Sequence, residues 1–228
     1  MRRNVSENQE KGGLRIVLAS ASPRRREILA HLGLDFEVIT ADTDEASAIR
    51  EPRALVCELS ARKARAVAQR LGLSPSKDAS GTEQNEPRTL LIAADTVVSV
   101  AGEVLGKPRD RDDAARMLRR LSGRSHEVYT GITLFCDGKY VTDAGRTEVR
   151  FAPLSEEEIA RYIATGEPDD KAGAYAVQGL AAAYIEGLNG CYFNVMGLPV
   201  HLLCTMCREA FGIELPYLAA ECRQEIEK

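Results

Sequence analysis

The sequence predicts an α/β fold in which a mixed β-sheet is flanked by helices. A short apolar run at Leu14–Ala19 leads directly into a helix start at Ser22-Pro23, the pattern of a strand followed by a crossover. The runs Val128–Phe135 and Lys139–Phe151 flank Asp137-Gly138, a strong signal for an antiparallel hairpin. Because crossover and hairpin connections occur in one chain, we expect parallel and antiparallel strands in the same sheet.

The remaining elements follow from apolar spacing and from residues that begin or end helices. A long helix is expected over Glu51–Leu71, with proline near its start and glycine after its end. Ser155 and Glu158 have the spacing of a capping box for a helix that reaches Ala164. The other expected elements are strands at Phe36–Thr40, Thr89–Ala94, Val97–Val100 and Val104-Leu105, a helix from Asp112 to Leu121, a glycine-rich stretch from Gly166 to Gly190, and a C-terminal helix that follows Gly197-Leu198-Pro199 and ends at Gly212.

Charge and hydropathy narrow the classes of function. The chain has 228 residues and a formal net charge of −4, so its overall charge gives no sign of a nucleic-acid partner. No apolar run is long enough to cross a membrane, and residues 1–13 are polar and are expected to form a disordered tail. Six cysteines without a disulfide-like spacing, in a chain without an export signal, predict a cytoplasmic protein.

Residues 14–228 are expected to form a single domain. Within it, the segment at 73–88 is polar and rich in turn-forming residues, and we interpret it as a flexible insertion. His201, Cys204 and Cys207 could suggest a metal site, but no second pair follows and the segment is apolar, so core packing is the favoured interpretation. His126 is expected to be structural.

The first segment with chemical content is the predicted helix start at Ser22. Ser22 would cap the helix, which places Arg24, Arg25 and Arg26 in its first turn. Cations at a helix N-terminus are disfavoured by about 0.3–1 kcal/mol each, so the arginines need another reason to be there. Free amides and guanidinium groups together form a site for a phosphate chain. The alternative is that the arginines extend into solvent, which we expect of Arg26.

Two lysines are further candidates for binding an anion. Lys63 lies near the middle of the apolar stripe of its predicted helix, so it either extends along that stripe to solvent or points into a cleft as a phosphate ligand. Lys107, in Gly106-Lys107-Pro108, lies on a turn. The spacing of glycines and the proline after the lysine do not match a P-loop, so Lys107 is either a phosphate ligand or a solvated loop residue.

Asp95 is the most unusual acidic residue in the sequence. It lies within the apolar run LLIAADTVVSV, where an unpaired carboxylate would be costly to bury. We therefore expect Asp95 to lie where a strand ends at a cleft, or to bind a cation, with the hydroxyl of Thr96 beside it. A turn aspartate is the alternative, which the following valines disfavour.

The glycine-rich segment supplies one candidate for recognition of a base. In DDKAGAYAVQG, small residues allow the backbone to approach a ligand closely. Gln178 can donate and accept hydrogen bonds at the same time, which matches the edge of uracil or thymine. By itself this is a weak signal.

Together, these segments resemble the Maf family of nucleoside-triphosphate pyrophosphatases. The matching pieces, in order, are LASASPRRREIL, ARKARAV, AADTVV, GEVLGKPRD, LSGRSHEVYTG, DKAGAYAVQG and NVMGLP. They extend from about Leu14 to Phe211. The number of motifs and their order make the resemblance specific.

The resemblance implies two lobes with a central cleft, a divalent cation (Mg²⁺ or Mn²⁺), a nucleoside triphosphate as substrate, and often a homodimer. By position, Asp95 matches the family's catalytic acidic residue and Glu45 an acidic residue near the metal, while Lys63 and Lys107 match lysines that bind the triphosphate. Arg24, Thr96 and Gln178 match positions linked to substrate choice in the branch that acts on dTTP and UTP rather than 7-methyl-GTP. Ala176 stands where many relatives have glycine.

These inferences predict an enzyme in which water attacks the α-phosphorus and pyrophosphate leaves. Ser22, Arg24, Arg25, Lys63 and Lys107 are the residues expected to hold the triphosphate. Asp95 would act on water polarised by the metal, or would hold the metal itself. The alternative function is a nucleotide-binding regulator of septum formation with little turnover, but this gives less reason for acidic residues beside a polyanion.

Overall fold

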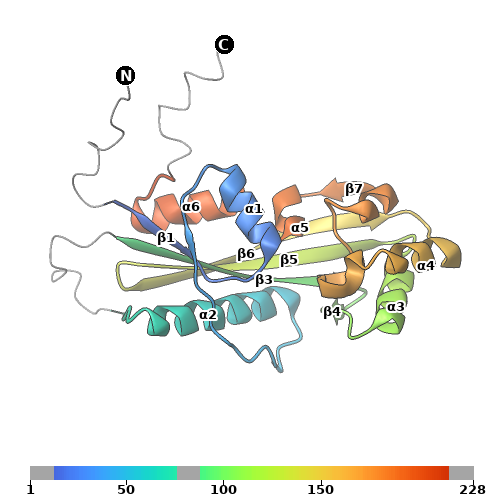
Figure 1. Ribbon diagram of the computed structural model, residues 1–228, viewed down its shortest axis with the longest axis horizontal. Helices are drawn as coiled ribbons and strands as arrows, with labels where there is room; N and C mark the ends of the chain where they lie inside the picture. The colour runs from blue at the N-terminus through green and yellow to red at the C-terminus, as the bar shows by residue number, and fades with distance from the viewer. Residues whose placement is uncertain (1–12, 76–87, 216–228) are drawn as a thin grey trace, which may run out of the picture.

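A central mixed sheet, covered by helices on both faces, organises the computed structural model, which describes residues 13–75 and 88–215 (Figure 1). Residues 1–12 of the predicted tail and residues 76–87 of the predicted insertion lie outside the described residues. The strands are β1 (Arg15–Leu18), β2 (Glu37–Val38), β3 (Thr89–Val100), β4 (Glu103–Leu105), β5 (Ser125–Cys136), β6 (Lys139–Phe151) and β7 (Ile185–Asn189). Their order is β2-β1-β3-β5-β6-β7, with β4 also paired to β3.

The predicted mixture of strand directions is confirmed. β1 pairs in parallel with β2 and β3, whereas β3, β5, β6 and β7 form antiparallel pairs. The turn between β5 and β6 has positive φ at both Asp137 (48°) and Gly138 (72°), as a two-residue hairpin requires. The helices are α1 (Pro23–His31), α2 (Pro52–Arg70), α3 (Arg111–Leu121), α4 (Glu156–Ala164), α5 (Tyr192–Met196) and α6 (Val200–Phe211), with 3-10 turns η1 (Glu167–Asp170), η2 (Ala172–Ala174) and η3 (Leu180–Tyr184).

Alternation along the strands directs apolar side chains to both faces of the sheet. Ile16 and Leu18 of β1 pack in the same cluster as residues of α1 and α6, whereas Val17 packs with residues of α2. A separate cluster joins α3 and α4 to the far halves of β3, β5 and β6. The long strands therefore carry two lobes, one around α1, α2 and α6 and the other around α3 and α4 (Figure 1).

One edge of β3 is divided between two partners. Residues Thr89–Ile92 pair with β1, and Val98–Val100 pair with β4, so a gap at residues 93–97 separates the two partners. The prediction that the strand ends at Asp95 was wrong: β3 continues through this residue because β5 pairs with β3 from Leu91 to Ser99 along the other edge. The gap leaves residues 93–97 without a partner strand on this edge, although the strand itself does not end there.

The predicted helix boundaries are largely confirmed. The capping box of Ser155 and Glu158 is present at α4, and the side chain of Glu51 accepts hydrogen bonds at the start of α2. Ser22 occupies the N-cap position of α1 and Pro23 follows it, as predicted, but the prediction that the serine side chain caps the free amides was wrong, because it makes no capping hydrogen bond. Instead, the backbone N–H of Ser22 donates to Oγ of Ser20 at 3.3 Å, which shapes the loop before the helix.

The C-terminal helix α6, which carries Cys204 and Cys207, packs into the core, as the sequence indicates. Cys207 is fully buried in α6, Cys204 packs against the same cluster, and His201 is exposed. Among the described residues, no group of three or more histidine, cysteine or acidic side chains could hold a metal ion. Within the same ranges, no helix combines the length and apolarity needed to cross a membrane.

Gly131 of β5 lets α2 approach the sheet beside the gap. It is the register partner of Asp95, and a methyl group at this position would overlap the backbone carbonyl of Val56 in α2. Lys63 lies on α2 seven residues, or about two turns, after Val56. The absence of a side chain at Gly131 thus sets the distance between the helix that carries Lys63 and the strand that carries Asp95.

We predict that Gly131→Ala lowers the free energy of unfolding by about 1–3 kcal/mol, because the overlap involves backbone that must shift. The measurement is urea denaturation followed by circular dichroism. Gly187→Ala in β7 is the matched control, since no atom lies within 4 Å of the added methyl group. Equal stability of the two variants would contradict the close packing of α2 on β5.

Candidate functional site

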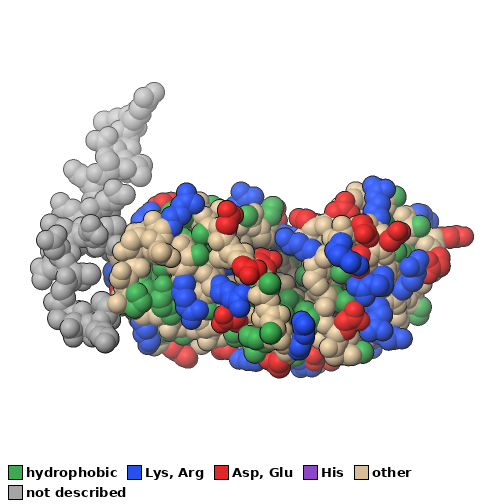
Figure 2. Space-filling model, turned by 90° about the horizontal axis from the view of Figure 1, so that it is seen from below, with side chains coloured by type: hydrophobic (Ala, Val, Ile, Leu, Met, Phe, Trp, Pro, Cys, Tyr) green, Lys and Arg blue, Asp and Glu red, His purple; other side chains and the backbone are tan. Residues whose placement is uncertain are grey.

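A cavity of about 950 Å³ opens at the gap in the edge of β3. Figure 2 shows this face of the molecule hollowed near its middle, with acidic and basic side chains around the hollow. Residues from both lobes line the cavity, so it is the central cleft that the sequence resemblance implies. All of the sequence-predicted site residues are among them: Ser22, Arg24, Arg25, Glu45, Lys63, Asp95, Thr96, Lys107 and Gln178.

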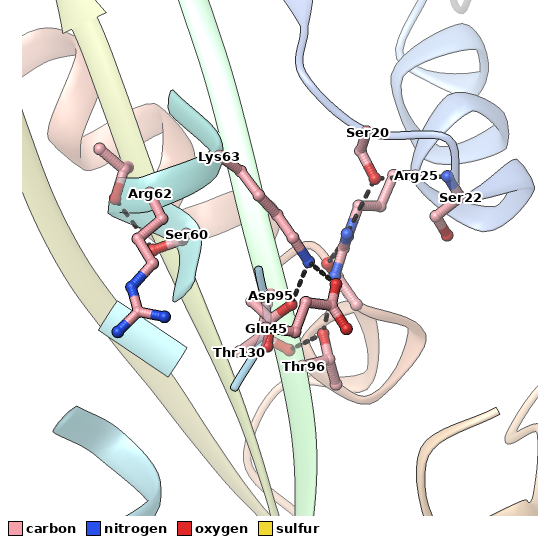
Figure 3. Close-up of polar contacts among 12 residues, drawn as sticks. Ser20, Ser22, Arg25, Glu45, Ser60, Arg62, Lys63, Asp95, Thr96 and Thr130 are labelled. Carbon is pink, nitrogen blue, oxygen red and sulfur yellow. Dashed lines mark hydrogen bonds and ion pairs between the residues drawn. The ribbon is translucent and has the colours of Figure 1, made fainter. Parts of the chain in front are cut away.

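Lys63 joins the two acidic residues at the centre of the cavity. Its Nζ lies 2.5 Å from Oδ1 of Asp95 and 2.8 Å from Oε1 of Glu45 (Figure 3). The Asp95 side chain is 12% exposed and that of Lys63 is 18% exposed, so little solvent screens this pair. Of the two interpretations of Lys63, the structure shows the one in which its amine points into a cleft.

Electrostatics favour the ionised form of Glu45. The hydrogen bond from Lys63 is the largest cause of the lowered pKa of Glu45, and the charges of Lys107 and Arg25 lower it further. Glu45 itself lies in the segment between β2 and α2, which has no regular secondary structure. Positive charges on α1 (Arg25), on α2 (Lys63) and on the loop after β4 (Lys107) thus all lower the pKa of this one carboxylate.

Arg62 holds the backbone on both sides of Glu45. Its NH1 donates to the carbonyl of Asp44 at 3.2 Å and to that of Ala46 at 2.8 Å. Sequence reasoning did not identify Arg62. Its position next to Lys63 was the only available signal, because the partner carbonyls are backbone groups whose place depends on the path of a loop.

Arg25 is buried, with 8% of its surface exposed, and its guanidinium bonds to three separate segments. Nε donates to the carbonyl of Gly197 at 2.8 Å, NH1 to Oγ of Ser20 at 2.8 Å, and NH2 to Oγ1 of Thr96 at 3.1 Å (Figure 3). Burial lowers the pKa of Arg25 to about 10, which leaves the group charged at neutral pH. The residue therefore ties α1, β3 and the turn before α6 together at the wall of the cavity.

The hydrogen bonds of Arg25 continue into the sheet. Oγ1 of Thr96 lies 2.9 Å from Oγ1 of Thr130, which donates to the carbonyl of Asn194 at 2.8 Å. Thr130 is fully buried and was not identified from the sequence, since a threonine in an amphipathic strand is ordinary. This chain of hydroxyls fixes the side chain of Thr96 relative to Asp95, its neighbour on β3.

The other candidates surround this centre. Arg24 is half-buried at the start of α1, and Arg26 is exposed, as expected. Lys107 is exposed on the loop after β4, where the carbonyl of Gly106 accepts a hydrogen bond from the backbone of Gly173 at 3.0 Å. Gln178 is also exposed and lines the cavity from the glycine-rich segment of the other lobe.

The arrangement suits a hard divalent cation that is shared with a ligand. Oxygens of Asp95 and Glu45 both lie within 2.8 Å of one ammonium nitrogen, so the two carboxylates can reach a single positive centre. Two carboxylates are too few for an all-protein cage, but Mg²⁺ sites at phosphates commonly use one or two carboxylates and complete the shell with water and substrate oxygens. The residues present therefore fit a cation of the magnesium type.

Comparison with known proteins gives a consistent family. The family described as Maf-like protein matches residues 15–210. A dTTP/UTP pyrophosphatase of Thermoanaerobacter sp. (strain X514) is 47% identical over 204 residues, which cover 89% of this chain and 100% of that protein. A dTTP/UTP pyrophosphatase of Chromobacterium violaceum is 48% identical over 202 residues, which cover 89% of this chain and 97% of that protein.

An archaeal relative, a dTTP/UTP pyrophosphatase of Thermococcus onnurineus, is 45% identical over 87% of this chain and 99% of its own length. Among solved structures, the Staphylococcus aureus Ham1 protein is similar with a TM-score of 0.47 and 15% sequence identity, covering 83% of this chain and 95% of that chain. The family match extends over nearly all of the residues that build the sheet and the cavity. This chain belongs to the Maf family.

Proposed function

We propose that this chain hydrolyses dTTP and UTP to the monophosphate and pyrophosphate. The single observation that carries the proposal is the convergence of Lys63, Asp95 and Glu45 in a cavity that is also lined by two arginines and a second lysine. The names of relatives that match almost the whole chain support the same activity.

Cations of the cavity provide the first requirement of the reaction, which is to bind a polyanion. Arg24, Lys63 and Lys107 approach from α1, α2 and the loop after β4. Each can neutralise part of the charge of the triphosphate, and arginine adds paired donors. Arg25 contributes charge from within the wall. Three of its five N–H donors are already bonded to protein oxygens.

Asp95 and Glu45 are the residues that would hold a divalent cation, Mg²⁺ or Mn²⁺. When bound, this cation supplies positive charge to the phosphate oxygens and to the leaving pyrophosphate. The amine of Lys63 is free to turn from the two carboxylates to the phosphates, because its flexible stem carries a compact charge. Without the divalent cation, the two carboxylates would repel the negatively charged substrate. Binding of the triphosphate beside the two carboxylates therefore requires the cation that they hold.

Asp95 acts on the attacking water. Its carboxylate orients the water towards the α-phosphorus and accepts a proton as the new P–O bond forms. The bond between the α-phosphorus and the bridging oxygen breaks, and pyrophosphate leaves with its charge stabilised by Lys63 and Lys107. Thr96 is held beside Asp95 by Arg25 and Thr130, and contacts the substrate from the same strand.

The first test is a pyrophosphate-release assay with dTTP, UTP, 7-methyl-GTP and ITP, with Mg²⁺, with Mn²⁺ and after chelation by EDTA. We expect turnover of dTTP and UTP in the presence of either cation. Chelation should abolish this turnover, because without a metal the two carboxylates repel the negatively charged triphosphate. Tight nucleotide binding without pyrophosphate release would instead favour a binding protein and contradict the proposal.

Asp95→Asn is expected to lower kcat by at least about 100-fold, in line with acid–base or metal contributions, while nucleotide binding is retained. Turnover is measured by pyrophosphate release, and binding by calorimetry. Asp143→Asn is the control, since Asp143, on β6, pairs with Arg53 of α2 and does not line the cavity. Near-normal turnover of Asp95→Asn would remove this residue from the mechanism.

Gln178→Ala is expected to reduce discrimination between dTTP or UTP and the purine nucleotides more than it slows the preferred substrate. The physical reason is the loss of an amide that both donates and accepts at the base. The ratio of kcat/KM values for dTTP and ITP is the measurement. An unchanged ratio would count against a base-reading role.

A further inference from the structure

Two buried or half-buried side chains of the second lobe hold the backbone on both sides of Gln178. Tyr162, on α4, accepts a hydrogen bond from the backbone N–H of Ala176 at 3.3 Å through its hydroxyl. Glu167, at the start of η1, accepts one from Leu180 at 3.0 Å and one from Ala181 at 3.4 Å. The anchored residues lie two before and two or three after the glutamine.

The two anchors are themselves connected. The hydroxyl of Tyr162 donates to Oε1 of Glu167 at 2.8 Å, so one phenol links both sides of the segment. Tyr162 is 2% exposed, and burial, followed by the hydrogen bond to Glu167, raises its pKa above the usual range. The phenol therefore keeps its proton at neutral pH and remains the donor to the carboxylate.

Packing at Gly179 shows how closely the segment lies on the carboxylate. A methyl group at this position would overlap both carboxylate oxygens of Glu167. Gly179 has ordinary negative φ, so the glycine is explained by this approach and not by backbone strain. The chain passes over Glu167 immediately after the glutamine, and the N–H groups of Leu180 and Ala181 donate to the same side chain.

Gln178 is the exposed polar residue of this segment, and Leu180, which is 59% exposed, is its exposed apolar residue. Ala176, Val177 and Ala181 are buried, whereas Gln178 is exposed and lines the cavity. Its side-chain amide makes no hydrogen bond within the described ranges 13–75 and 88–215, so no polar contact there directs it. A backbone fixed at both sides reduces the number of directions the amide can take before a ligand arrives.

We propose that Tyr162 and Glu167 are positioning residues for base selection, which hold the segment 176–181 so that Gln178 faces the base of the substrate. Neither side chain touches the nucleotide. Both act through the backbone that carries Gln178. This inference rests on the proposed function, because it requires that Gln178 read a pyrimidine.

The experiment measures the kcat/KM ratio of dTTP to ITP in Tyr162→Phe, Glu167→Gln and Gly179→Ala. We expect each to lower the ratio by about 3- to 10-fold, the range of one or two lost hydrogen bonds. The effect should lie mainly in KM for dTTP, with kcat for ITP unchanged. Gly179→Ala is informative because it keeps both side chains and only displaces the carboxylate.

Tyr184→Phe is the matched control. The ring of Tyr184 packs edge-on against that of Tyr162, with centroids 5.8 Å apart, and no hydrogen bond of its hydroxyl to residues 176–181 is present. It should leave the ratio unchanged. Thermal melting is recorded for every variant, because a purely structural role would lower Tm and leave the ratio at its wild-type value, which would overturn the proposal.

A double-variant cycle tests whether the anchors act through Gln178. In a Gln178→Ala background, Tyr162→Phe should cause no further loss of discrimination. Additive losses would overturn the inference. If the wild-type protein hydrolyses no pyrimidine triphosphate, both the proposed function and the present inference fail. If the wild type prefers dTTP and Gln178→Ala removes that preference while Tyr162→Phe keeps it, only the present inference fails.

Discussion

The incomplete pairing of one edge of β3 is the constraint on which the site depends. A parallel partner, β1, ends beside Ile92, and an antiparallel partner, β4, ends beside Val98. Between them the strand keeps its pairing with β5, so Asp95 and Thr96 stand on rigid backbone while one side of that backbone is open to the cavity. A strand that is held on one edge and free on the other can present a carboxylate without losing its own geometry.

Charge balance within the cavity follows from that opening. An isolated carboxylate at the exposure of Asp95 would be costly, and the ammonium group of Lys63 offsets this cost. Lys63 can reach Asp95 because Gly131, the register partner of Asp95 on β5, allows α2 to approach the sheet closely. The second carboxylate comes from a loop whose carbonyls are held by Arg62. Removing one partner therefore changes the environment of all the others.

The two lobes contribute different parts of the site. The lobe of α1 and α2 supplies most of the charged groups, which fit the polyphosphate common to all nucleoside triphosphates. The other lobe supplies Gln178 through a segment held by backbone hydrogen bonds to Tyr162 and Glu167. Separation of these tasks means that a change in the second lobe can alter base preference while the charged centre is retained. Arg25 stabilises the charged part, since it bonds to Thr96 on β3 and to the turn at Gly197.

The sequence by itself determined the mixed α/β class, the hairpin at Asp137-Gly138, the capping box at Ser155 and the candidate residues, because these depend on local spacing and on an aspartate that is out of place in an apolar strand. Tertiary structure decided what local patterns cannot encode. It showed that β3 continues through Asp95, that the side chain of Ser22 makes no capping hydrogen bond to α1, and that Arg25 is buried among protein oxygens. Arg62, Tyr162 and Glu167 were not predictable, because each acts on backbone groups of another segment, and the position of those groups exists only in the folded chain.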